Sequence, residues 1–169
     1  MSKVFLIGLP GSGKSTFGVQ LAVKLSLPFI DLDQVIEQHT GRAITDLFGN
    51  FGEAHFRSIE RSQLLEIDQL NSSYLLATGG GTPCYYDSMS FMKKQGVTVY
   101  LNPPIELIIK RLQGNTDRPL LNDNHALQLN KLYEKRKSIY KQSHITWQSE
   151  LLTYNDTSLT DLILAHKDV

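Results

Sequence analysis

Eight residues near the start of the chain have the types and the spacing needed to bind the phosphates of a nucleotide. Gly8-Leu9-Pro10-Gly11-Ser12-Gly13-Lys14-Ser15 fits the pattern GxxxxGK[ST], follows the apolar run Val4–Ile7 and leads into a segment with helical spacing. A glycine-rich turn between a strand and a helix directs several backbone N–H groups and the helix dipole at one anion. The lysine can reach the β and γ oxygens, and the serine hydroxyl is suited to Mg²⁺. We expect nucleotide contacts from Gly11, Ser12, Gly13, Lys14, Ser15 and Thr16.

Two acidic residues form a second candidate group. Asp31 and Asp33 lie at the end of the predicted strand 29–32. Residues two apart on a strand share a face, so both carboxylates would act on one site beyond the strand end. Because neighbouring carboxylates repel each other, the pair indicates a metal ion or a substrate with several hydroxyl groups. The alternative is structural, with Asp33 as the N-cap of the following helix and a solvated acid beside it.

Alternating strand and helix patterns place these residues at one edge of a sheet. Predicted strands cover 4–7, 29–32, 74–78, 97–101 and 150–154; predicted helices cover 16–25, 35–41, 52–70, 102–112, 127–140 and 159–165, with one helical turn at 44–48. This alternation predicts an α/β fold whose mostly parallel sheet is covered on both faces, with ligands at the C-terminal ends of the strands.

Length, charge and cysteine content indicate a small soluble enzyme. The 169 residues suggest one domain spanning 1–169, and we expect a monomer. Because 17 basic residues balance 17 acidic ones, the overall charge gives no argument for nucleic acid or a membrane surface as a partner. The single cysteine, Cys84, is expected to be packed rather than reactive and excludes an intramolecular disulfide. With no apolar run long enough for a membrane span or a targeting peptide, we expect the cytoplasm.

Several motifs, taken in order, resemble those of the shikimate kinase family. They are Gly8–Ser15, Phe29-x-Asp31-x-Asp33, Gly52-Glu53-x-x-Phe56-Arg57-x-x-Glu60, Gly79-Gly80-Gly81 and Arg118-Pro119-Leu120-Leu121. The resemblance implies a three-layer α/β/α P-loop kinase fold with a five-stranded sheet, a mobile lid at about 114–124 and an acceptor-binding helical region at about 33–61. It also implies transfer of the γ-phosphoryl group of ATP to the 3-hydroxyl of shikimate, on the chorismate route to aromatic amino acids, with Mg²⁺ as cofactor.

The resemblance also assigns the acceptor site. Asp33 would orient or deprotonate the attacking hydroxyl, and Arg57 and Arg136 would bind the carboxylate, because a guanidinium matches a carboxylate bidentately. Backbone amides would contact the acceptor at Gly79, Gly80 and Gly81, where a Cβ would intrude. Each has a plainer interpretation: the arginines as surface helix charges, the glycines as a flexible turn.

Three further residues have implied or alternative roles on the acceptor side. Glu60, one turn beyond Arg57, would hold that guanidinium by an ion pair. Phe48 and Phe56 would pack against the substrate ring, or else belong to the core.

On the nucleotide side the resemblance implies a catalytic role for Lys14 and for Arg118, the lid arginine that closes over the phosphates. Arg111 would lie at the adenine, Ser15 would ligate Mg²⁺ directly and Asp31 would hold it through water. The chain departs from the family at 154–158, where many members carry an arginine and a proline that frame adenine, so the adenine contacts there stay open.

Two other functions compete with this interpretation. A gluconate kinase or a nucleoside monophosphate kinase would share the phosphate loop and the lid but not the acceptor residues Asp33, Arg57 and Arg136. A binding protein that has kept the fold and lost turnover would be expected to have lost Lys14, Asp33 or Arg118, all of which are present.

Overall fold

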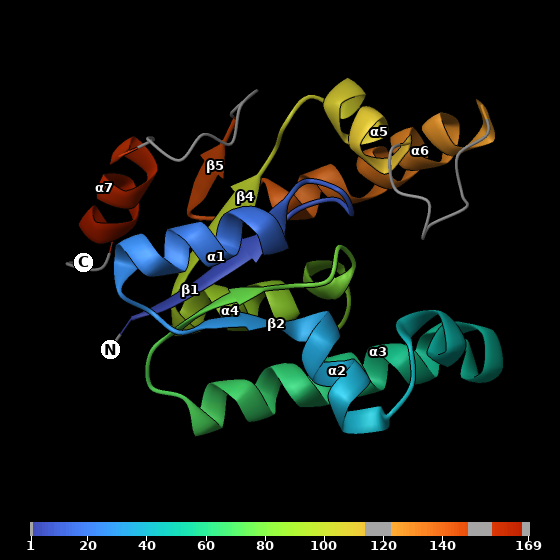
Figure 1. Ribbon diagram of the computed structural model, residues 1–169, viewed down its shortest axis with the longest axis horizontal. Coiled ribbons are helices and arrows are strands. Elements are labelled where there is room, and N and C mark those ends of the chain that lie inside the picture. The colour runs from blue at the N-terminus through green and yellow to red at the C-terminus, as the bar shows by residue number, and fades with distance from the viewer. Residues whose placement is uncertain (1, 114–122, 149–156, 167–169) are drawn as a thin grey trace.

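Five parallel strands form the central sheet of the computed structural model, which describes residues 2–113, 123–148 and 157–166 (Figure 1). The strands are β1 (Lys3–Ile7), β2 (Phe29–Asp31), β3 (Tyr74–Ala77), β4 (Val97–Leu101) and β5 (Ile145–Trp147), in the spatial order β2-β3-β1-β4-β5. The helices are α1 (Lys14–Leu25), α2 (Leu32–Thr40), α3 (Ile44–Leu70), α4 (Ser88–Gln95), α5 (Ile105–Gln113), α6 (Asp123–Tyr140) and α7 (Thr157–Ala165), with a short 3-10 helix η1 (Thr82–Cys84). The predicted fold class, an α/β fold around a mostly parallel five-stranded sheet, is confirmed.

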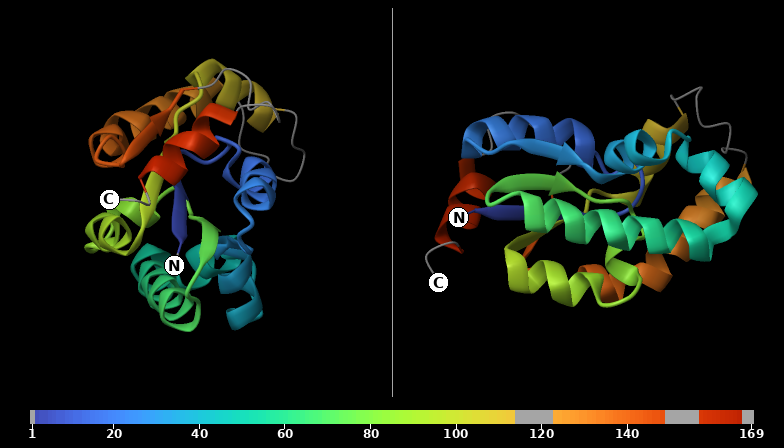
Figure 2. Two further views of the ribbon diagram at one scale, coloured as in Figure 1. Left: turned by 90° about the vertical axis from the view of Figure 1, so that its left-hand side faces the viewer. Right: turned by 90° about the horizontal axis from the view of Figure 1, so that it is seen from below.

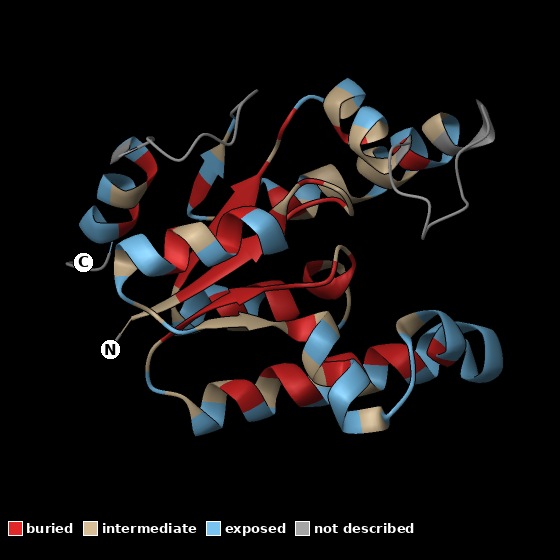
Figure 3. Ribbon diagram, in the orientation of Figure 1, coloured by how far each residue is buried: buried red, intermediate tan, exposed pale blue. Residues whose placement is uncertain are grey.

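The two faces of the sheet carry separate cores. Because side chains alternate along a strand, Val4 and Leu6 of β1 pack with α1 and α7, whereas Phe5 and Ile7 pack with α2, α3, α4 and α6. Apart from Lys3 at the start of β1, the central strands are buried along their length (Figure 3), as expected for a parallel sheet covered on both faces. The end-on view in Figure 2 shows helices on either side of the sheet.

The first half of the chain largely follows the sequence prediction. The helical turn at 44–48 and the helix at 52–70 are continuous as α3, with a kink at Gly52, whose φ of 80° lies in the left-handed region that glycine adopts most readily. A second glycine, Gly41, ends α2 in the same region.

The second half differs in two places. The fifth described strand is Ile145–Trp147, which pairs with β4 and which the sequence pattern did not predict; the predicted strand at 150–154 lies outside the described residues. Helix α4 was missed, although Met89 and Met92 have helical spacing between Asp87 and Gly96. Both methionines are buried in the core beside α3.

The parallel order brings four connections to the C-terminal ends of the strands. The candidate phosphate loop (residues 8–15) follows β1, and Asp31 ends β2. The three glycines at 79–81 follow β3, and the N-terminal turn of α5 follows β4. In the described ranges, none of the helices has the length and apolarity to cross a membrane.

His144 carries a pH-dependent part of the fold's stability. Its Nδ1 accepts a hydrogen bond from the backbone N–H of the buried Thr98, 3.1 Å away, at the junction of β4 and β5. Burial lowers the pKa of His144, and the nearby Lys93 and His166 lower it further. A depressed pKa favours the folded state above the histidine's ordinary pKa of about 6.5, and this contribution is lost as the pH falls below that value.

We therefore expect the free energy of unfolding to fall between pH 7.5 and pH 5.5, and to fall less in His144→Asn, whose amide oxygen can accept the same hydrogen bond without titrating. Urea unfolding at both pH values measures this, with His39→Asn, an exposed histidine on α2, as the control. An equal loss of stability in His144→Asn and in the unaltered protein would contradict the role of His144.

Candidate active site

The loop between β1 and α1 is built to surround an anion. Gly8 has a φ of 145°, and a Cβ there would lie 2.6 Å from the carbonyl oxygen of Leu101, so only glycine fits. Helix α1 begins at Lys14, so the N–H groups of its first turn face the loop. The Lys14 Nζ is buried and donates to the carbonyls of Gly8 at 3.0 Å and Leu9 at 2.9 Å. The lysine is thus held against the loop, at the position where phosphate oxygens would compete for it.

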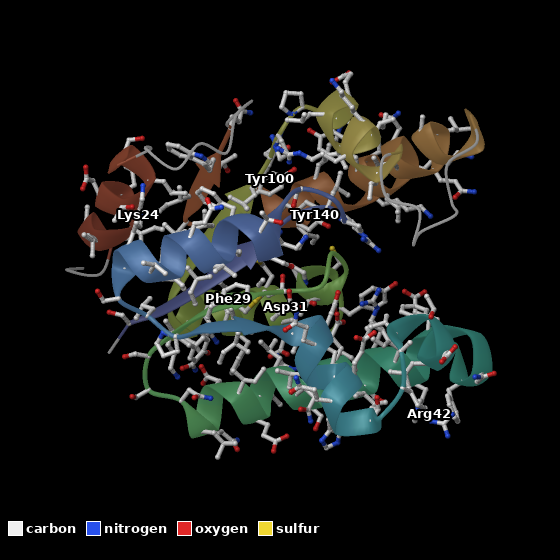
Figure 4. All side chains as sticks on the ribbon, viewed as in Figure 1. Lys24, Phe29, Asp31, Arg42, Tyr100 and Tyr140 are labelled. Atoms are coloured by element: carbon white, nitrogen blue, oxygen red, sulfur yellow. The ribbon has the colours of Figure 1, made fainter. Side chains whose placement is uncertain are left out.

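Ser15 and Asp31 meet beside this loop and offer two oxygens to a cation. The Ser15 hydroxyl donates to Asp31 Oδ2 at 2.6 Å, and Figure 4 shows Asp31 where β2 passes into α2. Oxygen ligands suit Mg²⁺, which usually keeps several waters and shares the phosphates of its substrate. Within the described ranges, no three His, Cys, Asp or Glu side chains gather around one metal position. The Ser15 and Asp31 oxygens nevertheless fit a Mg²⁺ ion that is completed by water and phosphate.

The predicted arrangement of Asp31 and Asp33 on one strand is wrong. Strand β2 ends at Asp31, whose Oδ1 accepts from the backbone N–H groups of Asp33 at 3.0 Å and Gln34 at 3.4 Å. This N-cap starts α2 at once, so Asp33 lies in the first turn of a helix rather than on the strand. The N-cap role considered for Asp33 belongs to Asp31.

Asp33 nevertheless lies beside the three glycines that follow β3. A Cβ on Gly79 would be 2.7 Å from Glu60 Oε1 and 3.1 Å from Asp33 Oδ1. Helices α2 and α3 therefore converge at this point with the loop of residues 79–81, which we call the glycine loop. A Cβ on Gly80 would be 2.6 Å from Pro10 Cδ of the phosphate loop. The glycine loop therefore packs directly between the acidic residues and the phosphate loop.

Arg57 is held in a fixed orientation by two glutamates and a tyrosine. Its Nη1 donates to Glu60 Oε2 at 2.7 Å, while Nε and Nη2 donate to Glu53 Oε1 at 3.3 and 3.1 Å. The guanidinium lies 4.3 Å from the ring centroid of Tyr85, and a Cβ on Gly81 would collide with it. Arg57 and Glu60 are only 6% and 2% exposed, which a charged pair tolerates because each satisfies the other.

The ionisation of this cluster follows from these contacts. Burial lowers the pKa of Arg57, but the ion pair with Glu60 and the hydrogen bonds to both glutamates outweigh it, and the net pKa is raised. A hydrogen bond from the Tyr85 hydroxyl, 2.7 Å from Glu53 Oε1, lowers the pKa of Glu53, and Arg57 and Arg136 lower it further. Arg57 is therefore cationic at every working pH.

Arg136 comes from α6 and faces the same cluster. It is partly buried and close enough to Glu53 and Cys84 to lower the pKa of both groups. For Cys84 burial outweighs this effect and raises the pKa of the thiol, as expected for a packed cysteine. The structure thus brings Arg136 and Arg57, which are 79 positions apart in the sequence, to one end of the glycine loop.

The two phenylalanines lie beside Arg57 in different surroundings. Their ring centroids are 4.4 Å apart, and the Arg57 guanidinium lies 5.6 Å from the ring of Phe48 and 5.0 Å from that of Phe56. Phe56 belongs to the buried core, whereas Phe48 is 36% exposed. Only Phe48 is therefore available to a ligand ring.

The remaining nucleotide-side residues are described in part. Arg111 Nη1 donates to the backbone carbonyl of Ser12 at 3.3 Å, which places α5 against the phosphate loop. Thr16 is exposed in the first turn of α1. Arg118, most of the predicted lid and most of the divergent segment 154–158 lie outside the described residues.

A cavity of about 440 Å³ lies apart from these residues, between the phosphate loop, α5 and α6. Its lining is mostly apolar and consists of Leu9, Asn102, Pro103, Pro104, Ile105, Ile108, Tyr133 and Gln148. Among the described residues, none that lines this cavity is charged, so they do not suit an anionic substrate.

Sequence reasoning missed two residues of the Arg57 cluster. Tyr85 lies beside the guanidinium, and Thr82 donates from its hydroxyl to Glu60 Oε1 at 2.6 Å. Both follow the three glycines within four positions, and that proximity is the only signal in the sequence that could have indicated them.

Comparisons with known proteins agree with this geometry. The family model described as Shikimate kinase matches residues 10–163. A shikimate kinase of Azobacteroides pseudotrichonymphae is 41% identical over 162 residues, which cover 92% of this chain and 95% of that protein. The crystal structure of an Acinetobacter baumannii shikimate kinase in complex with shikimate superimposes with a TM-score of 0.88 at 33% identity, covering 99% of this chain and 94% of that one. A gluconokinase of Sinorhizobium meliloti, with a TM-score of 0.61 at 14% identity over 99% and 94% of the two chains, shares the fold alone.

Proposed function

This chain belongs to the shikimate kinase family, and from that premise we infer that it transfers the γ-phosphoryl group of ATP to the 3-hydroxyl of shikimate. The observation that carries this inference is the convergence of Asp33, Glu60 and Arg57 on a glycine loop that packs against the phosphate loop. An acid, a buried cation and side-chain-free glycine backbone beside a phosphate site suit a small acceptor that carries both hydroxyl groups and a carboxylate. The product, shikimate 3-phosphate, belongs to the chorismate route to aromatic amino acids.

We propose that the phosphate loop and the lid neutralise the transferred charge. Lys14 would leave the Gly8 and Leu9 carbonyls to bind the β and γ phosphates, and the N–H groups of the loop would hold the rest of the triphosphate. Arg118 would approach the phosphates from the lid, and Arg111 would lie at the adenine. A Mg²⁺ ion, held directly by Ser15 and through water by Asp31, would supply charge neutralisation of the phosphates.

On the acceptor side we propose that Asp33 orients the attacking hydroxyl and accepts its proton, while Arg57 and Arg136 hold the carboxylate. Glu60 and Glu53 fix the Arg57 guanidinium before the substrate arrives, so less conformational freedom is lost on binding. Phosphoryl transfer asks the protein chiefly for alignment of the two reactants and stabilisation of charge, and this arrangement supplies both. We propose a monomer in the cytoplasm that acts on small molecules.

A coupled ADP-release assay with MgATP and shikimate, gluconate, AMP or CMP tests the proposal. We expect activity with shikimate alone, and loss of that activity when EDTA removes the metal. Activity with gluconate or a nucleoside monophosphate instead would favour the related kinases. Shikimate binding by calorimetry without ADP release would favour a protein that has lost turnover.

A further inference from the structure

The last residue of α6 reaches the glycine loop of the acceptor site. The hydroxyl of Tyr140 donates to the backbone carbonyl of Gly80 at 2.5 Å, across 60 positions of sequence. The Tyr140 side chain is completely buried, and its ring lies 5.0 Å from that of Tyr100 at an angle of 38° (Figure 4). Burial raises the pKa of Tyr140 to about 12, so the hydroxyl remains a donor at any pH at which the enzyme would work.

This hydrogen bond acts on a peptide unit, not on one atom alone. The carbonyl of Gly80 and the N–H of Gly81 belong to the same planar trans peptide and point in opposite directions. Glycine lacks the Cβ that would restrict rotation of this unit, so an external contact is needed to hold it. Fixing the Gly80 carbonyl therefore fixes the direction of the Gly81 N–H, in a residue whose Cα lies against the Arg57 guanidinium.

The same helix carries a second group for the site. Arg136 lies one turn before Tyr140 on α6 and is close enough to the phenol to lower its pKa, against the larger effect of burial. One helix thus carries both the tyrosine bonded to the glycine loop and the arginine that faces the same cluster. The Gly80–Gly81 peptide cannot rotate far while the hydroxyl remains bonded, and the backbone of Arg136 is one helical turn away.

We propose that Tyr140 is a positioning residue for the acceptor: its hydroxyl locks the Gly80–Gly81 peptide and aligns it with Arg136, so that the amide and the guanidinium meet the substrate together. This rests on the proposed function, because the acceptor site is taken to be the glycine loop. Tyr140 does not itself touch the substrate. We expect Tyr140 to affect the binding of the acceptor and not that of the nucleotide, because its hydrogen bond to Gly80 does not reach the phosphate loop.

Tyr140→Phe removes only the hydroxyl, and Tyr100→Phe is the matched control. Tyr100 is an equally buried tyrosine in the same ring pair, but its hydroxyl donates to Asn102 Oδ1 at 2.7 Å and not to the glycine loop. We expect Tyr140→Phe to raise the KM for shikimate about 5- to 10-fold, the effect of one buried hydrogen bond, with the KM for ATP changed less than twofold. Tyr100→Phe should leave both KM values within twofold, although both variants lower the melting temperature.

The amide of Gly81 gives a readout that does not depend on turnover. In a protein labelled with ¹⁵N-glycine we expect its resonance to shift or broaden in Tyr140→Phe and to stay in place in Tyr100→Phe. An unchanged KM for shikimate in Tyr140→Phe, or an equal rise in both KM values in the two variants, would overturn the proposal. So would a Gly81 resonance indifferent to Tyr140. If the unaltered protein released no ADP with shikimate, the proposed function would fail, and the resonance would still decide whether Tyr140 holds the peptide.

Discussion

Replacing Asp33 by asparagine is expected to lower turnover about 100-fold or more, while ATP binding persists. Asparagine has the same shape but can neither accept the proton of the attacking hydroxyl nor carry a charge beside it, and general base catalysis contributes 10² to 10⁴ in rate. The fold should survive, because Asp31 and not Asp33 caps α2. Asp33 lies within reach of Gly79 and Glu60, so the loss falls at the acceptor.

Steady-state kinetics with shikimate and with ATP varied separately measures this effect. Asp46→Asn is a suitable control, since Asp46 is an exposed aspartate in the first turn of α3. We expect kcat to fall in Asp33→Asn alone, and the KM for ATP to stay within twofold in both variants. A kcat within threefold of the unaltered protein would contradict a catalytic role for Asp33 and leave it a merely structural acid.

Asp31 and Asp33 show what a sequence pattern can predict and what it cannot. Phe29–Asp31 has the composition of a strand, and two acids at its end correctly indicate the edge where a site lies. The pattern could not tell that the Asp31 carboxylate would bind the N–H groups of Asp33 and Gln34 and so begin a helix at Leu32, three residues earlier than the apolar spacing suggests. The prediction that Asp31 and Asp33 share one face of a strand was therefore wrong, although both lie at the edge of the sheet that it indicated.

The sheet was predicted where its strands are apolar and missed where tertiary pairing decides. Almost every residue of the central strands β1, β3 and β4 is buried, and their largely apolar sequences predicted this. Strand β5 has three residues, of which only Ile145 is fully buried, and it exists because it pairs with β4 at the sheet edge. Such a short edge strand leaves almost no periodic signal of its own.

The site was predictable as a set of motifs but not as a network. Sequence spacing found Arg57 and its partner Glu60, one helical turn apart. It could not show that Tyr85 stacks on the guanidinium and donates to Glu53, because those contacts depend on how η1 packs against α3. Contacts between residues far apart in the chain leave no periodic pattern in the sequence from which they could be predicted.

Loss of the Arg57 guanidinium is expected to weaken shikimate binding about 100-fold, because charged hydrogen bonds of this kind are each worth about 1.5 to 3 kcal/mol. Arg57→Ala would also leave Glu60 buried and unpaired, which is strongly destabilising, at about 3 to 5 kcal/mol. A loss of binding in that variant alone would therefore not separate recognition from folding.

Arg57→Lys distinguishes a loss of substrate recognition from a loss of folding. A lysine keeps the positive charge beside Glu60 but lacks the planar fork that donates to a carboxylate in two places, so the fold should persist and shikimate binding should still fall at least tenfold. Arg61→Lys, on the same helix and paired with Asp87 at 2.5 Å, is the matched control and should bind shikimate normally. Calorimetric titration of both variants, after thermal unfolding has shown that they are folded, gives the comparison. Shikimate affinity in a folded Arg57→Lys equal to that of Arg61→Lys would show that the carboxylate is bound elsewhere, because removing the planar fork at position 57 would then have no effect.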